Sequence, residues 1–394
     1  MKKLNKTLYS VLCLMVCMCT LSGCIEEFEA DIPSEDSNLL VVEGTIISSR
    51  KNTFKLSRTL PINSFDTPKM ETEAILSVRG TDGSEYKAQS NYGKYTCMVG
   101  DLNPDEEYYL HIEVDGEIYE SVPQKPMRTE KIAEVSGVQN TPESNIDILI
   151  TPEAPIDSTK ENYYSWTYDE TWEVHPDYIT DLFFDVENMR IIKKENQFPV
   201  CGWIDATSST IMVGAGSNYQ GQHIQRLKLY DIDRSNERMY YRYSGLIHQR
   251  AISKAEYEYE LARRQASSEM GGLFTPQPSS LPTNIHCRTS KKNVIGFVGC
   301  SFNTGEYRFF LNYTDYSIYR QKIGSLAWIE DCSMEDCLRM VERGMYLCKY
   351  EDSMKSVTGK SRSAWAYGRQ VDVRYRGAYT EMPSFWLLTK NVSY

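Results

Sequence analysis

Cys24 is the residue whose surroundings point most directly to chemistry. Lys2, Lys3 and Lys6 precede an apolar run from residue 8 to residue 21, and small residues lie directly before Cys24. A charged start, a short apolar middle and a small-residue cleavage site are typical of a secretory signal. The apolar run is shorter than a membrane-spanning helix requires. The sequence therefore predicts that residues 1–23 are a signal peptide that is removed on export.

The four residues Leu21-Ser22-Gly23-Cys24 match the bacterial lipobox. This match implies cleavage before Cys24, acylation of its sulfur and of its new amino group, and anchoring in a lipid bilayer through the acyl chains. The alternative is an ordinary signal peptide that happens to place a cysteine at the cleavage site. Residues 24–37, with four acidic side chains between positions 26 and 31, are expected to form a solvated tether.

Seven cysteines remain once the leader and Cys24 are set aside, namely Cys97, Cys201, Cys287, Cys300, Cys332, Cys337 and Cys348. An exported chain meets an oxidising compartment, so disulfides are expected. Because seven is an odd number, at least one thiol should be free, and Cys97 is the candidate. A disulfide between Cys287 and Cys300, which flank a turn, is predicted. The last three cysteines lie in one acidic segment whose pairing the sequence leaves open, and one of them could pair with Cys201.

No established catalytic motif is found among the residues that usually carry chemistry. The five histidines do not have the His-Glu-x-x-His spacing of zinc proteases, and there is no nucleophile elbow or phosphate loop. His286 and Cys287 with Cys300 lack the Cys-x-x-Cys pair that would complete a zinc site. Asp169 and Glu170 could belong to a glycosidase pair, but surface acids are the preferred interpretation. We therefore expect no catalytic residue, metal or cofactor, and the net charge of -11 argues against a nucleic-acid partner.

Aromatic residues repeat with period two along residues 163–175. Tyr164, Trp166, Tyr168 and Trp172 share one face of the expected strand, and polar residues occupy the other face. The aromatic face is interpreted in two ways, as the core of a sheet or as a platform on which a sugar or another flat ligand stacks. In the second interpretation Trp166, Tyr168, Trp172 and Trp203 are the candidate ligand-binding residues.

Short β-branched and aromatic runs, separated by turn residues, recur from residue 39 to residue 122 and predict a β-sandwich. The segment Leu102–Ile112 resembles the fibronectin type III signature, in which the tyrosine, here Tyr108, caps a corner through its hydroxyl. The predicted fold is mainly β. An immunoglobulin- or fibronectin III-like β-sandwich covers residues 38–127, and a larger β-rich domain covers residues 128–394.

The larger domain is predicted to carry one main α-helix over residues 254–270. Ser253 and Glu256 have the spacing of a capping box, and Gly271-Gly272 follows as a helix stop. Three prolines then follow within seven residues, which predicts an extended loop.

Several motifs along the mature chain resemble one known family. They are Leu39 to Gly44, the Tyr108 motif, Tyr164-x-Trp166, Cys201-x-Trp203, Tyr243 to Ile247, Gly272 to Ser279 with Asn284-Ile285, Ile295-Gly296-Phe297 and Pro383-x-Phe385-Trp386. The family consists of outer-membrane lipoproteins of Bacteroidota with a domain of unknown function, and its genes commonly lie beside those of TonB-dependent receptors. The acidic tether also resembles the export tag of Bacteroidota lipoproteins that face the cell exterior. The family has no established catalytic residues to carry over, and Val371-Asp372-Val373 stands where it often has a cysteine pair.

The resemblance, together with the lipobox, implies a non-enzymatic lipoprotein on the cell surface that works with a TonB-dependent receptor in nutrient capture. A surface enzyme acting on glycans, with Trp166 and Trp172 as its platform, is the alternative from another class. A structural, adhesin-like module is the third interpretation.

Overall fold

A computed structural model describes residues 38–60, 66–155, 157–196, 198–208, 210–267, 282–354, 356–357, 359–387 and 392–393. The predicted signal peptide, Cys24, the acidic tether, the end of the helix predicted over 254–270 and most of the proline loop lie outside these residues. Among the described residues, strands make up 45% and helices 14%, which confirms the mainly β fold class. Within the described ranges no helix is long and apolar enough to cross a membrane.

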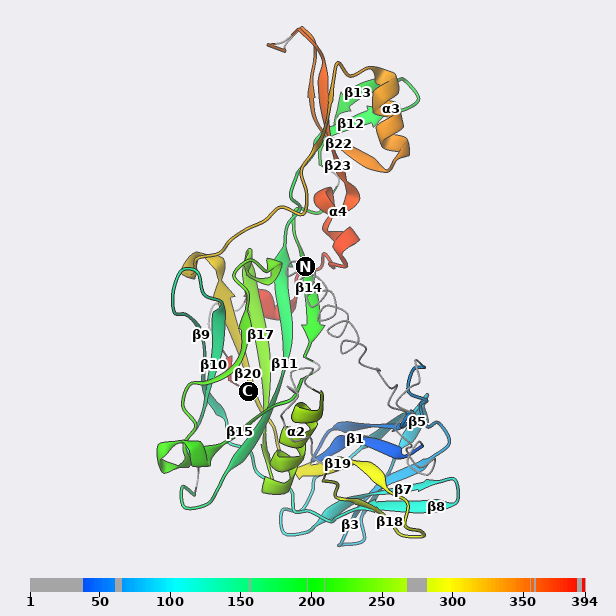
Figure 1. Ribbon diagram of the computed structural model, residues 1–394, viewed down its shortest axis with the longest axis vertical. Coiled ribbons are helices and arrows are strands. Elements are labelled where there is room, and N and C mark those ends of the chain that lie inside the picture. The colour runs from blue at the N-terminus through cyan, green and yellow to red at the C-terminus, as the bar shows by residue number, and fades with distance from the viewer. Residues whose placement is uncertain are drawn as a thin grey trace, which may run out of the picture.

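The N-terminal sandwich consists of two five-stranded sheets (Figure 1). One sheet has the order β19 (Val294–Ser301), β1 (Leu40–Ile47), β2 (Lys51–Arg58), β6 (Lys94–Met98) and β5 (Gln89–Asn91). The other has the order β18 (Ile285–Cys287), β8 (Glu117–Ser121), β7 (Tyr108–Val114), β3 (Ile75–Gly80) and β4 (Glu85–Lys87). Alternate residues of β2 point inward, and Phe54, Leu56 and Ile112 are fully buried between the sheets.

The predicted domain boundary at residue 127 is wrong for two strands of this sandwich. That boundary places β18 and β19 in the second domain, but β19 pairs in parallel with the whole of β1, from Leu40 opposite Val294 to Ile47 opposite Ser301. Parallel neighbours need a long crossover, and residues 128–284 of the predicted second domain lie between these two strands in the sequence, whereas residues 302–394 follow β19. The N-terminal sandwich is therefore complete only after the chain has built most of the rest of the molecule.

The corner predicted at Tyr108 is confirmed. Its hydroxyl accepts a hydrogen bond from the backbone N–H of Asn103 at 2.9 Å, and its ring is buried. This contact fixes the entry of the chain into β7, as in other tyrosine corners of β-sandwiches.

The central sandwich packs a six-stranded sheet on a three-stranded one. The larger sheet has the order β14 (Gly202–Thr207), β11 (Tyr163–Val174), β17 (Arg242–Ile252), β20 (Gly305–Asn312) and β24 (Val392–Ser393), and β15 (Met212–Ala215) also pairs with β11. The smaller sheet has the order β16 (Leu227–Ile232), β10 (Ile146–Pro152) and β9 (Ile132–Gln139).

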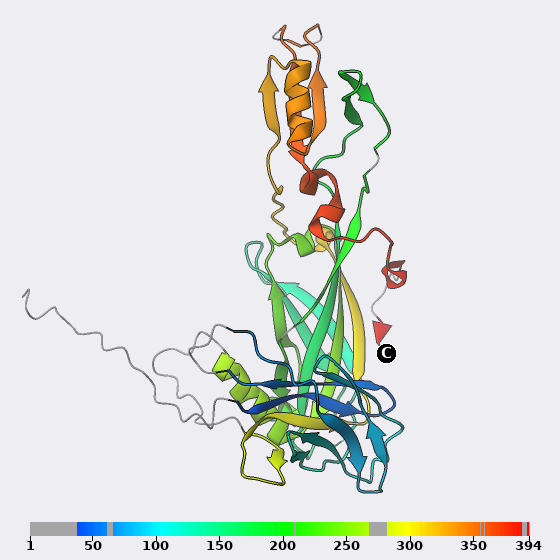
Figure 2. The same cartoon turned by 90° about the vertical axis from the view of Figure 1, so that its right-hand side faces the viewer.

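A small distal module lies at the opposite end of the molecule from the N-terminal sandwich (Figures 1 and 2). It contains the sheet β21 (Ala327–Glu330), β23 (Arg362–Tyr367) and β22 (Met345–Glu351), the helix α3 (Met334–Glu342) and the hairpin of β12 (Leu182–Asp185) and β13 (Arg190–Lys193). Trp365, Cys337 and Met340 are buried at its centre. This third core was not expected from the sequence, which assigned all residues after 127 to one domain.

The longest described helix, α2 (Lys254–Ser267), contacts β11 and β15 of the central sandwich and β19 of the N-terminal sandwich. The other helical segments are α4 (Gly368–Val371) and the 3-10 turns η2 (Gly216–Asn218), η3 (Gln220–Gln222), η4 (Glu237–Met239), η5 (Tyr313–Asp315), η6 (Val373–Arg376) and η7 (Ser384–Leu387). Helix α2 thus lies where the two sandwiches meet.

Candidate functional site

The rings predicted as a ligand platform are largely buried in this structure. Trp166, Trp172 and Trp203 are only 1%, 9% and 5% exposed. The indole N–H of Trp166 donates to Gln249 Oε1 at 2.9 Å, and Tyr168 stacks on the ring of Tyr230 with 3.9 Å between ring centroids. A stacking platform needs an open ring face, so that prediction is wrong and the core interpretation of the aromatic strand is confirmed.

Two different layers bury these rings. Trp166, Tyr168 and Trp172 lie on the face of β11 that packs against the three-stranded sheet. Trp203 lies on the opposite face of the six-stranded sheet, where Trp386 covers it edge-on with 6.2 Å between ring centroids. The parity of the aromatic face is evident from the sequence, but the segment that covers Trp203 is not.

The open face of the six-stranded sheet carries a row of polar contacts instead. His248 Nε2 lies 2.9 Å from Asp169 Oδ2, and its Nδ1 lies 3.5 Å from Glu306 Oε1. Thr207 donates to the other oxygen of Asp169 at 2.7 Å, and Arg50 of the N-terminal sandwich reaches Glu306 at 3.4 Å. The row therefore crosses β14, β11, β17 and β20 and ends on the neighbouring sandwich.

A cavity of about 290 Å³ opens beside this row, between the two sandwiches. It is lined by Thr45, Ile47 and Arg50 from the N-terminal sandwich and by Ser165, Thr167, Ile211, His248, Gln249, Arg250 and Thr304 from the central one. The hydroxyl oxygen of Thr304 is buried and has no hydrogen-bond partner within the described part of the chain. The cavity thus offers hydroxyl and charged groups beside the apolar side chains of Ile47 and Ile211.

A second cavity of about 260 Å³ adjoins the first and shares Thr45, Ile211 and Arg250 with it. Its remaining lining residues are Val42, Glu43, Gly44, Glu256, Tyr259, Glu260, Arg263 and Phe297. The two cavities together are called the junction cleft here. Both signs of charge line it, and Arg250 lies where its two halves meet.

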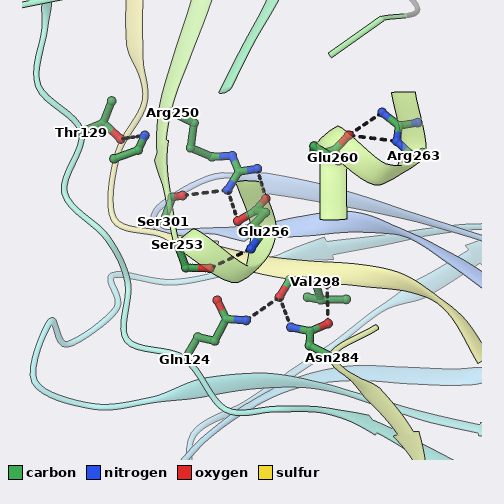
Figure 3. A network of polar contacts seen from close by, with 11 residues as sticks. Gln124, Thr129, Arg250, Ser253, Glu256, Glu260, Arg263, Asn284, Val298 and Ser301 are labelled. Carbon is green, nitrogen blue, oxygen red and sulfur yellow. Dashed lines mark hydrogen bonds and ion pairs between the residues drawn. The ribbon is translucent and has the colours of Figure 1, made fainter. Parts of the chain in front are cut away.

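Arg250 and Glu256 form a buried ion pair at this point (Figure 3). Their side chains are only 14% and 6% exposed, and Arg250 contacts both oxygens of the Glu256 carboxylate. Arg250 also donates to the hydroxyl of Ser301 at 3.4 Å. Gly299 leaves room for the carboxylate, because a methyl group there would collide with Glu256. The pair therefore joins β17, α2 and β19, and with them the two sandwiches.

The predicted capping box of α2 is half present. The Ser253 hydroxyl accepts from the backbone N–H of Glu256 at 3.2 Å, as expected. The carboxylate of Glu256 was expected to reach back to the start of the helix, but Arg250 holds it instead. A charged partner on a neighbouring strand makes a stronger hydrogen bond than a backbone amide does.

A second acid of α2 faces the same half of the cleft. Glu260 is buried and bonds Arg263, with 2.8 Å between Oε2 and a guanidinium nitrogen. Burial raises the pKa of the Glu260 carboxyl above its ordinary value, and the neighbouring charge of Glu256 adds to this rise. Burial likewise raises the pKa of Tyr259 to about 12. This half of the cleft is thus lined by charged and hydrogen-bonding groups.

Other polar contacts hold the junction in one arrangement. The Asn284 side chain bonds both the N–H and the C=O of Val298, each at 2.9 Å, and Gln124 donates to the same carbonyl at 3.2 Å (Figure 3). Thr129 accepts from the backbone N–H of Ala251 at 3.0 Å. No group of three or more metal-ligating side chains occurs in the described ranges.

The disulfide predicted between Cys287 and Cys300 is not formed in this structure. Both are free thiols: the sulfur of Cys287 lies near the hydroxyls of Thr289 and Ser290, and Cys300 is buried in β19 opposite Ile46. The other disulfide candidates, Cys201, Cys332, Cys337 and Cys348, are also thiols here, and Cys97 is a buried thiol as expected.

Most of the junction cleft is not indicated by the sequence alone. The sequence indicates Asp169 only as a possible member of a carboxylate pair, and it gives no sign of a role for Arg250 or Thr304. The sequence signal for the cleft is the period-two alternation along β17, which places Ser244, His248 and Arg250 on one face of the strand. That pattern cannot show that a second sandwich, 100 to 200 residues away in sequence, lies over this face.

Comparisons with known proteins identify a family but no activity. The model of a family described as "Domain of unknown function (DUF4249)" matches residues 25–306. No curated protein matches the chain. Among solved structures, the chain is similar to a crystal structure of a DUF4785 family protein from Legionella pneumophila subsp. pneumophila str. Philadelphia 1, with 12% identity and a TM-score of 0.16. That match covers 53% of this chain, which spans about half (52%) of the Legionella chain.

Proposed function

The chain belongs to the DUF4249 family, and we propose that it is a lipid-anchored protein of the outer membrane that faces the cell exterior and works with a TonB-dependent receptor in nutrient capture. The observation that carries this proposal is the lipobox Leu21–Cys24 with the acidic segment directly after it. An acylated Cys24 keeps the folded body at the membrane surface. The resemblance to Bacteroidota lipoproteins supplies the receptor as partner.

Within this proposal the junction cleft is the site of ligand capture. It lies between two sandwiches that the Arg250–Glu256 ion pair joins, and Arg250 and Glu260 offer both signs of charge beside His248. Pre-formed concave sites with a few well-placed polar groups are the usual places for small ligands. The chemistry favours a small polar or charged nutrient over a flat apolar one, because the aromatic rings of β11 are buried.

The glycan-acting enzyme was motivated by Trp166 and Trp172 as a substrate platform. Both rings lie in the core, so this observation no longer favours an enzyme. The structural module remains the outcome expected if neither a receptor nor a ligand is found.

The proposal is tested by affinity purification of the tagged chain from cross-linked native membranes. We expect a TonB-dependent receptor among the recovered proteins, and we expect Cys24→Ala to be lost from the outer-membrane fraction and to recover less receptor. Recovery of the full-length anchored chain without any such receptor would contradict the partnership. Normal membrane retention of Cys24→Ala would contradict the anchor.

A further inference from the structure

Two cysteines flank the first turn of helix α3. Ser333 is the N-cap, and it forms a complete capping box with Asp336: the N–H of Asp336 donates to the Ser333 hydroxyl at 3.2 Å, and the N–H of Ser333 donates to the Asp336 carboxylate at 2.9 Å. Cys332 directly precedes the cap and Cys337 directly follows Asp336. These are the two positions at which apolar side chains pack together in a hydrophobic staple.

The two sulfurs occupy the place of that staple and face each other. The distance from Cys332 Sγ to Cys337 Sγ is 3.4 Å, and the residues are only 4% and 0% exposed. The Ser363 hydroxyl of β23 donates to Cys332 Sγ at 3.0 Å, and the indole N–H of Trp365 donates to that hydroxyl at 2.8 Å. The staple is thus held from the sheet side as well as by the helix.

We infer that Cys332 and Cys337 form an intrachain disulfide that closes the staple across the first turn of α3. A disulfide needs the sulfurs about 2.05 Å apart, so an approach of little more than 1 Å completes the bond. In the cell the inference rests on the proposed export, because disulfides persist in oxidising compartments. The remaining five cysteines have no sulfur neighbour among the contacts of the described residues, so the pairing left open by the sequence becomes specific.

The chemistry is thiol–disulfide exchange with a small or protein disulfide as the oxidant. One cysteine thiolate attacks the donor disulfide, forming a mixed disulfide and releasing one donor thiolate. The second cysteine thiolate attacks the protein sulfur of that mixed disulfide, forming the Cys332–Cys337 bond and releasing the second donor thiolate. The two cysteines are oxidised, the donor is reduced to two thiols, and these take up the two protons lost by the cysteines.

The surroundings also set when the exchange can occur. Burial and the neighbouring Cys332 raise the pKa of Cys337 to about 12, so its thiolate is scarce in the folded module. The bond should therefore form while the module folds, and afterwards it should resist reductants that cannot reach the core.

The test is refolding of the purified, reduced chain in a buffer of reduced and oxidised glutathione, followed by alkylation and peptide mass analysis. Trypsin releases residues 323–339, which contain both cysteines and no other. We expect this peptide without alkyl groups and two hydrogens lighter than its reduced form. Cleavage after Glu335 should then give two pieces that separate only on reduction. Full alkylation of the peptide after refolding, or a bond from either cysteine to Cys201 or Cys348, would overturn the inference.

A matched variant and a second source of protein complete the design. Cys348→Ser should leave the staple disulfide unchanged, whereas Cys337→Ser should leave Cys332 open to alkylation after denaturation. The same peptide, prepared from native membranes, shows whether the protein resides in a compartment that is oxidising enough to keep the disulfide. A staple that forms in the glutathione buffer but is reduced in native protein supports the geometry and contradicts the proposed export, so the two failures are distinct.

Discussion

Glu256→Gln is the substitution that tests most directly how the two sandwiches are joined. The amide keeps the size and one acceptor of the carboxylate but removes its charge, and it leaves the buried guanidinium of Arg250 without a counter-ion. Breaking a buried ion pair by removing one partner costs about 3–5 kcal/mol. Because Ser301 and the glutamine oxygen still accept from Arg250, we expect the lower end, about 3 kcal/mol.

For a body of this size, 1 kcal/mol corresponds to roughly 2–4 °C in the unfolding midpoint. Glu256→Gln should therefore unfold about 6–12 °C below the parent protein in scanning calorimetry. Glu258→Gln is the matched control: it makes the same chemical change in the same helix, but Glu258 is exposed, so we expect a change within about 0.5 kcal/mol.

A double variant separates the loss of the ion pair from other effects of substitution. Arg250→Met with Glu256→Leu removes both charges together, and replacement of a whole buried pair by apolar side chains is often neutral. We expect the double variant to be more stable than Glu256→Gln. The reasoning would be refuted if Glu256→Gln unfolded within about 1 °C of the parent, or if its cost equalled that of the Glu258→Gln control.

Three further predictions concern the other bodies. Tyr108→Phe should cost about 1 kcal/mol in urea unfolding of the N-terminal sandwich, because it removes the hydrogen bond from Asn103, and no loss would exclude the corner as a stabilising contact. Trp166→Ala should cost about 3–5 kcal/mol through a core cavity, whereas wild-type stability of that variant would contradict a core position. Hydrogen bonds from Ser333 lower the pKa of Asp336 from 3.8 to about 2. The stabilisation by Asp336 is therefore complete above pH 3.8 and is lost as the pH falls towards 2, so an acid titration of the midpoint should be flatter for Asp336→Asn, and an unchanged titration would contradict this.

Local features of the fold were predictable from the sequence. The period-two strands, the corner at Tyr108 and the Ser253 cap each depend on residues close together in the chain, and each is found in the structure. The period-two pattern of residues 163–172 is likewise found, because β11 pairs with β17 without a register shift from Tyr163 to Trp172.

Features that depend on distant segments were not predictable. Nothing around Val294 indicates that it pairs with Leu40, so the return of β19 to the first sandwich was missed. The junction cleft depends on that return, since it forms only where the completed sandwich meets β17. The staple is predictable in part. The segment Cys-Ser-x-x-Asp-Cys at residues 332–337 has the spacing of a capping box, but only the folded start of the helix shows that the two sulfurs are in contact.

The position of the molecule in the cell depends on the N-terminal cysteine of the mature chain. Mass analysis of the N-terminal peptide of the native protein tests it most directly. We expect a peptide that begins at Cys24 and carries acyl chains on its sulfur and its amino group. A peptide that retains residues 1–23, or one with an unmodified Cys24 thiol, would contradict both the lipid anchor and the proposed partnership with a receptor at the cell surface.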